Sequence, residues 1–254
     1  MRGDRVAISV FKRYEKKFML TTEQYLKMRE FLADYMDYDK YCLNDNVYCL
    51  YNIYLDSPNN DLIRRSVEKP VYKEKLRIRS YYPVREKDDK VFFEIKQKHE
   101  GVVTKRRAVM TYGDTMEMIR TKKLPENTPK KYIDAQVQKE ILRMLVDYDL
   151  SPAVFLSYHR IAMFGKEDPE LRITFDTEIR ARRTDVNFDK ELYAEPLLEE
   201  GKILMEIKIP LVMPMWLARY LSENKIFSSS FSKYGKEYER FVLSGKQNLE
   251  DILL

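Results

Sequence analysis

Residues 73–80 read KEKLRIRS, a segment in which two kinds of side chain alternate. The odd positions are all cationic: Lys73, Lys75, Arg77 and Arg79. The positions between them carry Glu74, Leu76 and Ile78. Because successive side chains of a β-strand point to opposite faces, the segment predicts a strand with four cations on one face. Four like charges in a row repel one another, so we expect something negative to lie against that face.

Further segments alternate in the same way, and each has a charged face of mixed sign opposite an apolar face. They are residues 11–19, 91–98, 102–110, 153–164, 171–182 and 203–210. For the segment 171–182 the alternation predicts one charged face that contains Arg172, Asp176, Glu178, Arg180 and Arg182. Residues 46–56 are another strand candidate, and the sequence SPNN directly after them predicts a turn.

Four segments predict helices between or after these strands. Thr21 and Gln24 have the spacing of a capping box, and apolar residues follow at helical intervals. The other helices are predicted over residues 133–145, from Pro214 onward, and over 232–243. Many antiparallel strands with a few helices packed outside make the expected fold class α+β, with the sheet dominant. Because no internal repeat and no second-domain boundary can be recognised, we expect residues 1–254 to form a single domain.

The composition excludes several functional classes. Of the 254 residues 34% are charged, yet the net charge is only +5, so a cationic site must arise from the placement of charges. Glycine occurs 7 times, and neither the P-loop motif nor the dinucleotide-binding motif is present. Two cysteines are too few for a disulfide scaffold or a zinc site. The sequence shows no transmembrane run and no signal peptide, which favours a cytoplasmic protein.

Two interpretations of the charged faces are open. One face of an antiparallel sheet is often solvated and is allowed to be charged. Alternatively, about eight strands close into an antiparallel β-barrel with the helices outside, and the charged faces line a tunnel that holds a slender polyanion. Arginine on these faces favours the tunnel, because its planar group suits bidentate phosphate recognition. Inward acids would offset part of the positive charge, and some could hold a hard divalent cation. They are Glu15, Glu94, Glu178 and Glu206.

Taken in order, these motifs resemble those of a known family. The series runs R-x-E-x-K, IYLDSPNNDL, KLRIRSY, EIKQKHEG, VTKRR, SYHR, LRITFDTEI, MEIK and FSKY, from about Arg13 to Lys233. It resembles the polyphosphate polymerase domain of the VTC (vacuolar transporter chaperone) family, within the triphosphate tunnel metalloenzyme or CYTH-like superfamily. Each motif alone is weak, whereas the ordered series is specific. The resemblance implies a tunnel that binds ATP and a growing inorganic polyphosphate chain together with Mn²⁺ or Mg²⁺.

The resemblance also implies roles for individual residues. Four arginines match the catalytic phosphate clamps: Arg77, Arg79, Arg160 and Arg172. Seven further residues are expected to bind triphosphate or polyphosphate: Lys17, Lys75, Lys96, Lys105, Arg107, Ser232 and Lys233. Glu206 matches the metal-binding glutamate, and Glu15 is either a second metal ligand or an ion-pair partner of neighbouring cations. Ser230 stands where the family has a lysine, and Lys225 or Lys236 could supply the missing contact.

The first strand favours a polymerase, a phosphotransferase that moves the γ-phosphate of ATP to the chain, over a hydrolase. Hydrolytic tunnel enzymes typically read E-x-E-x-K there, whereas Arg13 replaces the first acid in this chain. A polymerase needs no general base, because its attacking terminal phosphate is already ionised. Two alternatives stay open: a tunnel-type inorganic or nucleoside triphosphatase, and a non-catalytic polyanion-binding module. We expect no nucleic-acid partner, since most aromatics lie on the apolar faces. A membrane partner is left open.

Overall fold

One antiparallel sheet dominates the computed structural model, which describes residues 14–40, 42, 47–68, 70–100, 102–126, 132–188, 193–210 and 212–244. Its strands follow the order β11-β1-β10-β8-β7-β3-β4-β5-β6, while β2 pairs with β7 and β9 pairs with β8. The strands are β1 (Tyr14–Thr21), β2 (Met36–Tyr38), β3 (Tyr48–Asp56), β4 (Tyr72–Ser80), β5 (Lys90–His99), β6 (Val102–Thr111), β7 (Ser151–Gly165), β8 (Arg172–Arg182), β9 (Glu195–Pro196), β10 (Lys202–Ile209) and β11 (Ser228–Ser229).

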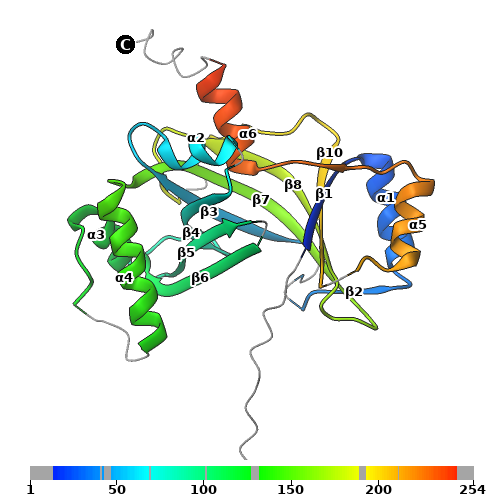
Figure 1. Cartoon of the computed structure of the whole chain (residues 1–254), viewed down its shortest axis with the longest axis horizontal. Coiled ribbons are helices and arrows are strands. Elements are labelled where there is room, and N and C mark those ends of the chain that lie inside the picture. The colour runs from blue at the N-terminus through cyan, green and yellow to red at the C-terminus, as the bar shows by residue number, and fades with distance from the viewer. Residues whose placement is uncertain are drawn as a thin grey trace, which may run out of the picture.

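Helices lie in three groups around this sheet (Figure 1). They are α1 (Thr22–Leu32), α2 (Asp61–Val67), α3 (Tyr112–Thr121), α4 (Tyr132–Asp147), α5 (Met215–Glu223) and α6 (Lys233–Tyr238), the last continued by a π-helical segment (Glu239–Leu243). Figure 1 shows α1 beside α5 at one end, α3 beside α4 at the other, and α2 beside α6. In the part of the chain that is described, no helix is long and apolar enough to cross a membrane.

The predicted strands are present, and the segment KEKLRIRS lies in β4. β4 pairs with β3 on one side and with β5 on the other, so it is an interior strand. The other alternating segments form β1, β3, β5, β6, β7, β8 and β10. Arg13, expected at the start of the first strand, lies outside the described residues. Period-two alternation therefore located the main strands of the sheet.

The predicted capping box begins α1. Thr21 Oγ1 accepts from Gln24 N at 3.2 Å, and Gln24 Oε1 accepts from Thr21 N at 3.1 Å. Two backbone donors are thereby satisfied at the helix start. The predicted helices at 133–145, after Pro214 and at 232–243 are α4, α5 and α6 with its π-helical extension. Helices α2 and α3 were not predicted, because each is short and its apolar positions are few.

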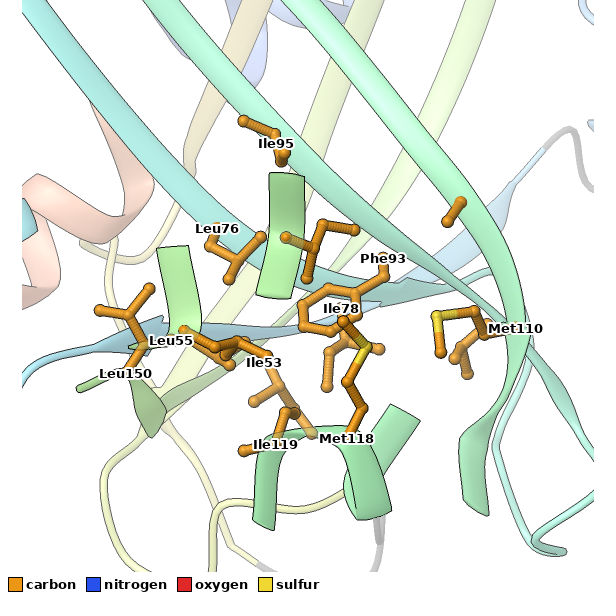
Figure 2. Close-up of a cluster of buried hydrophobic side chains, with 14 of the residues drawn as sticks. Ile53, Leu55, Leu76, Ile78, Phe93, Ile95, Met110, Met118, Ile119 and Leu150 are labelled. Carbon is orange, nitrogen blue, oxygen red and sulfur yellow. The ribbon is translucent and has the colours of Figure 1, made fainter. Parts of the chain in front are cut away.

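Two apolar cores cover one face of the sheet. The even positions of β4, Leu76 and Ile78, are fully buried in the first core, together with Phe93 of β5 and Met118 of α3 (Figure 2). The helices α3 and α4 close this core. The second core packs α1 and α5 on β1, β10, β8 and β7. The two cores hold the sheet from outside, and we call the opposite face of the sheet the inner face.

A β-bulge in β8 changes which side chains reach the inner face. The register jumps from His159 opposite Thr177 to Ser157 opposite Arg180, and Glu178 has a φ of 49°. One extra residue reverses the alternation, because side chains alternate with a period of two. Arg182 therefore turns to the outer side, where its Cζ lies 3.9 Å from the centre of the Phe155 ring.

The predicted inward positions of three charged residues in β8 are consequently wrong. Glu178 and Arg180 pair with each other at 2.9 Å, with both side chains about half exposed. Arg182 donates to Asn187 O at 2.9 Å instead of reaching the inner face. Ile179 and Ala181 take the inner positions. The alternation prediction holds only for the part of β8 that precedes the bulge, which contains Arg172 and Asp176.

Closure of the sheet into a barrel is not confirmed. Among the described residues β11 and β6 are the two ends of the sheet, and no strand pairing joins them. The inner face is nevertheless strongly curved. Glu15 of β1 and Lys96 of β5 lie close enough for their charges to interact, although five strands separate β1 from β5 in the sheet order. The architecture is thus a curved antiparallel sheet with helices packed around it.

Fully buried and exposed positions of the sheet should differ sharply in their effect on stability. We expect Ile78→Ala to lower the free energy of unfolding by about 2–5 kcal/mol, because it leaves a cavity in a fully buried site. Urea unfolding followed by circular dichroism measures this loss. The control Val103→Ala, at a position of β6 that is 44% exposed, should change stability by less than about 0.5 kcal/mol. Equal losses for the two variants would contradict the assignment of faces.

Candidate functional site

Cations from seven strands and one helix gather on the inner face. They are Lys17 (β1), Lys208 (β10), Arg172 (β8), Arg160 (β7), Lys75, Arg77 and Arg79 (β4), Lys96 (β5), Lys105 and Arg107 (β6), and Lys233 (α6). The strands bring them together because these positions alternate with the residues of the two outer cores. Eleven residues were expected from the sequence to clamp or bind phosphate. Ten of them are among these cations, and the eleventh, Ser232, directly precedes Lys233.

Glu94 is the acidic centre of the β4–β6 part of the site. Its side chain is 1% exposed, and its Oε2 accepts from Arg77 Nε at 2.9 Å. Lys105 Nζ lies 2.6 Å from Oε1, and Arg79 Nε lies 3.9 Å from Oε2. Burial alone would raise the pKa of Glu94, but the three cations outweigh it and lower this pKa to about 2. Glu94 is therefore ionised at neutral pH and fixes the cations around it.

Polar groups of β3 and β7 orient the two arginines of β4. Arg79 donates to Asn52 Oδ1 at 2.9 Å and to Tyr158 OH at 3.1 Å, and Arg77 donates to Tyr54 OH at 3.2 Å. Burial would raise the pKa of Tyr54, but Arg77 and neighbouring cations outweigh it and lower the pKa to about 7. Asn52 and Tyr54 were not predicted as site residues. Their alternation with Ile53 was the available signal, although the segment carries no charged face.

Asp176 and Glu206 form a second acidic centre on β8 and β10. Arg160 makes a bidentate pair with Asp176, at 2.6 Å and 2.7 Å. Lys233 Nζ lies 2.5 Å from Asp176 Oδ2 and 3.1 Å from Glu206 Oε1. Burial would raise the pKa of Glu206, but Lys233, Arg160 and Lys17 hold it well below the usual range. Asp176 is fully buried. Alternation placed it on the charged face, but it was not predicted as a site residue.

Glu15 links the two sides of the curved sheet. Its oxygens lie 3.4 Å from Lys17 Nζ and 4.0 Å from Lys208 Nζ. Burial raises the pKa of Glu15, and Lys96 is the strongest of the cations that together bring it below the usual range. Because Lys96 belongs to β5 and Glu15 to β1, these strands face each other across the inner face.

Two partly buried lysines have no ion-pair partner among the carboxylates of the described residues. In the part of the chain that the structure describes, no acidic oxygen lies within 4 Å of Lys75 Nζ or Lys96 Nζ. Burial, together with neighbouring lysines, lowers the pKa of Lys75 to about 8. Burial also lowers the pKa of Lys96, with Arg77 and Lys17 adding to the effect. Glu15 acts on Lys96 only from beyond ion-pair distance, and cations held near one another without a directly paired carboxylate favour the binding of an anion.

The helix α6 carries Ser232 and Lys233 to the site, and buried polar contacts hold this helix in place. Ser232 caps α6 by accepting from Gly235 N, and its Oγ also accepts from Lys75 Nζ at 3.0 Å. Tyr234 donates to Asp56 Oδ2 at 2.8 Å, while the other oxygen of Asp56 accepts from the backbone at the start of α2. The motif IYLDSPNNDL thus joins α2 to α6 and positions the Lys233 ammonium.

A buried ion pair between Arg183 and Glu237 fixes α6 a second time. The guanidinium donates to both carboxylate oxygens of Glu237, at 2.6 Å and 2.9 Å, and to Asn60 Oδ1 at 2.8 Å. Glu237 is fully buried. The pair was not predicted, since it joins segments 54 residues apart in the chain.

Two predicted cationic residues lie at the edge of the site. Arg172 reaches Asp39 at 3.3 Å, and its Cζ lies 4.7 Å from the Phe164 ring centre. Arg107 is exposed on β6, the end strand of the described sheet. The two lysines suggested to supply the contact missing at Ser230 are both exposed. Lys225 is exposed after α5, and Lys236 pairs with Glu239 at 3.9 Å on the surface.

The residues near Glu206 fit a divalent cation that is shared with phosphate. Among the described residues no group of three or more His, Cys, Asp or Glu side chains forms a metal site. Mg²⁺ in phosphate sites, however, commonly takes one or two carboxylates and completes its shell with water and substrate oxygens. Glu206 and Glu15 both contact Lys17. Thr174, opposite Glu206 on β8, has a buried hydroxyl with no hydrogen-bond partner in the described structure.

Acid should selectively remove the contribution of Glu94. Its folded pKa of about 2 lies below the ordinary value of 4.5, so its stabilisation is complete above pH 4.5 and is lost as the pH falls towards 2. We expect Glu94→Gln to cost about 3 kcal/mol at pH 7 and progressively less between pH 4.5 and 2. Urea unfolding at each pH measures this difference, with the exposed Glu200→Gln as control. A difference that does not change with pH would contradict the prediction.

Comparison with known proteins agrees with this geometry. A family model described as the VTC domain matches residues 12–242. Comparison with curated proteins gives no match. Among solved structures, a Bacillus halodurans protein described as an adenylate cyclase has a TM-score of 0.50 at 13% identity, over 91% of this chain and 99% of its own. This likeness shows a shared fold.

Two further solved structures are similar at lower scores. A Vibrio parahaemolyticus protein, also described as an adenylate cyclase, has a TM-score of 0.45 at 11% identity, over 89% of this chain and 97% of its own. An adenylyl cyclase-like protein of Hippeastrum, described as having a dominant triphosphatase activity, has a TM-score of 0.45 at 18% identity, over 91% of this chain and 95% of its own. Since the family model spans most of the described sheet and all the inner-face cations, the chain belongs to the VTC domain family.

Proposed function

We propose that the inner face is the active site of an ATP-dependent polyphosphate polymerase, which transfers the γ-phosphate of ATP to the end of an inorganic polyphosphate chain. The observation that carries this proposal is a pair of partly buried lysines, Lys75 and Lys96. Both have cations around them, and no carboxylate of the described residues lies within 4 Å of either ammonium. A chain of phosphates supplies a negative charge at each step along its length. It would therefore neutralise a curved row of cations that a small monoanion could not cover.

Each side chain has a distinct role in this proposal. Phosphoryl transfer requires mainly positioning and neutralisation of charge. Arg77 and Arg79, oriented by Glu94 and Asn52, would grip phosphate oxygens with their remaining donors. Arg160 and Arg172 would hold the phosphates on the opposite side of the curved sheet. The other cations would bind the substrate along its length: Lys17, Lys75, Lys96, Lys105, Arg107 and Lys233, with the Ser232 hydroxyl beside Lys75.

Glu206 and Glu15 are proposed to hold Mn²⁺ or Mg²⁺, with Thr174 as a neighbouring oxygen donor. The bound cation would polarise phosphate oxygens and neutralise the charge that develops on the leaving group. Because Lys17 lies within 4 Å of both carboxylates, it would move towards the phosphates when the carboxylates take a cation. Lys233 would then keep its contact with Asp176.

The acids of the inner face support transfer to a phosphate rather than to water. A hydrolase that activates water with a carboxylate needs one that can take a proton near neutral pH. Cations hold the pKa of Glu94 at about 2, and they also keep those of Glu15 and Glu206 below the usual range. Such weak bases are poorly suited to activate water. The terminal phosphate of a polyphosphate chain is already ionised and needs no base.

The proposal predicts a specific product pattern. Incubation of the purified protein with ATP and Mn²⁺ should release ADP and produce phosphate polymers, detected by gel electrophoresis. Arg77→Ala and Glu206→Gln should each reduce polymer formation about 100-fold or more, because they remove groups that stabilise the transferring phosphate. The surface variant Lys236→Ala should behave like the wild type.

Other products would identify a different activity. Release of orthophosphate without polymer would replace the proposal with a triphosphatase. Tight polyphosphate binding with no turnover, for any divalent cation tested, would replace it with a polyanion-binding module. Unchanged polymer formation by Glu206→Gln would contradict the metal assignment while leaving the polymerase in place.

A further inference from the structure

The inner face changes from cationic to aromatic where β4 ends. Its odd positions run Lys73, Lys75, Arg77, Arg79 and then Tyr81, which directly follows the strand. The neighbouring strands also become apolar there. Phe92 of β5 pairs with Arg79 of β4, and Val109 of β6 pairs with Phe92. Tyr48, at the start of β3, completes the group. We use the name aromatic edge for these three aromatic residues and the adjoining valine: Tyr48, Tyr81, Phe92 and Val109.

The aromatic edge is open to solvent although it is apolar. Tyr81 is 38% exposed and Val109 is 51% exposed, while Phe92 is partly buried. The ring centres of Tyr81 and Phe92 lie 5.5 Å apart in an edge-to-face arrangement, and those of Tyr48 and Tyr81 lie 6.2 Å apart. Arg107 Cζ lies 4.7 Å from the Phe92 ring centre. The rings contact one another without covering the exposed part of Tyr81.

Local hydrogen bonds hold the turn that carries Tyr81. Ser80 Oγ donates to Tyr82 O at 2.6 Å and accepts from Tyr82 N at 3.2 Å. Tyr82 OH donates to Lys90 O, at the start of β5, at 2.6 Å. These contacts fix the residues on both sides of Tyr81. The ring of Tyr81 is therefore presented beside the cationic site by a preorganised turn, which lowers the entropic cost of binding a ligand there.

We propose that Tyr81 and Phe92 form a stacking platform for the base of a nucleoside triphosphate whose phosphates lie against Arg79 and the cations beyond it. This inference rests on the proposed function and identifies where its nucleotide substrate is held. Inorganic polyphosphate has no apolar surface, so it gives no reason for exposed aromatic rings next to the phosphate site. A nucleotide carries a base on one side of its phosphates, and every base has a π-face that stacks on aromatic side chains.

The spacing along β4 fits such a ligand. Two residues of a strand span about 7 Å, so Tyr81 lies one step of this size beyond Arg79. The ribose would occupy this step, with the α-phosphate near Arg79 and the γ-phosphate directed towards Arg77 and Lys75. Arg107, over the Phe92 ring, lies beside both the base and the first phosphate. Stacking tolerates any base, so the platform is expected to distinguish nucleotides from inorganic triphosphate more strongly than ATP from GTP.

Calorimetric titration of the full chain with two probes, ATP and inorganic tripolyphosphate, tests the platform. Tyr81→Ala should weaken ATP binding about tenfold and change tripolyphosphate binding less than twofold. Tyr81→Phe keeps the ring and should retain wild-type binding of both probes. Tyr193→Ala removes a tyrosine that is 74% exposed elsewhere on the surface and should also leave both unchanged. The thermal unfolding midpoint of each variant checks that the fold is retained.

The two probes separate failure of the platform from failure of the proposed function. Equal weakening of ATP and tripolyphosphate by Tyr81→Ala, or no weakening of either, would overturn the platform and leave the phosphate site in place. Failure of the wild-type protein to bind either probe would overturn the proposed function and the platform with it.

Discussion

Lys75, Lys96 and Lys208 are partly buried near one another, and the repulsion among such cations is the constraint on which the arrangement of the site depends. Burial and neighbouring positive charge lower the pKa of Lys75 and of Lys208 to about 8. Ionised carboxylates shared between cations offset this repulsion. Glu94 serves the β4–β6 side of the site, and Glu206 serves β1, β7 and α6. These carboxylates do not neutralise all the cations, and the remaining positive charge favours the binding of a polyanion on the inner face.

The curved sheet makes this crowding tolerable because apolar cores hold its other face. In β4 the same eight-residue segment supplies both requirements, since Leu76 and Ile78 are fully buried outside while Arg77 and Arg79 point inward. The helix α6 then closes over the inner face, held by Asp56 and Arg183. Energy from packing and from buried hydrogen bonds is thus used to position cations that would otherwise separate. Such preorganised charge is what phosphoryl transfer requires of a protein.

Alternation predicted much of the site because a strand's faces follow directly from a period of two. Arg77, Lys96 and Glu206 reach the inner face for this reason, and no tertiary information was needed to place them. The bulge at Glu178 has no such signal. The extra residue reverses the faces of β8, but it can be recognised only from the pairing with the partner strand β7. Asn52 was missed because it carries no charge. The anchoring of α6 through Asp56 was missed because the two segments meet only in the fold.

Whether the sheet closes into a barrel could not be predicted from the sequence either. Strand number and charge pattern favoured a closed tunnel, but pairing between the end strands depends on edge hydrogen bonds that alternation does not encode. The described strands form an open sheet whose curvature still brings Glu15 of β1 towards Lys96 of β5. A phosphate chain could therefore be enclosed by facing side chains without a closed ring of strands.

The central claim is that this inner face holds a row of phosphates. A crystal structure with inorganic tripolyphosphate tests it most directly. We expect phosphate oxygens at hydrogen-bond distance, roughly 2.7–3.0 Å, from Arg77, Lys75 and Lys233. Tripolyphosphate bound only on the outer surface, with these three side chains still in their present contacts, would contradict it.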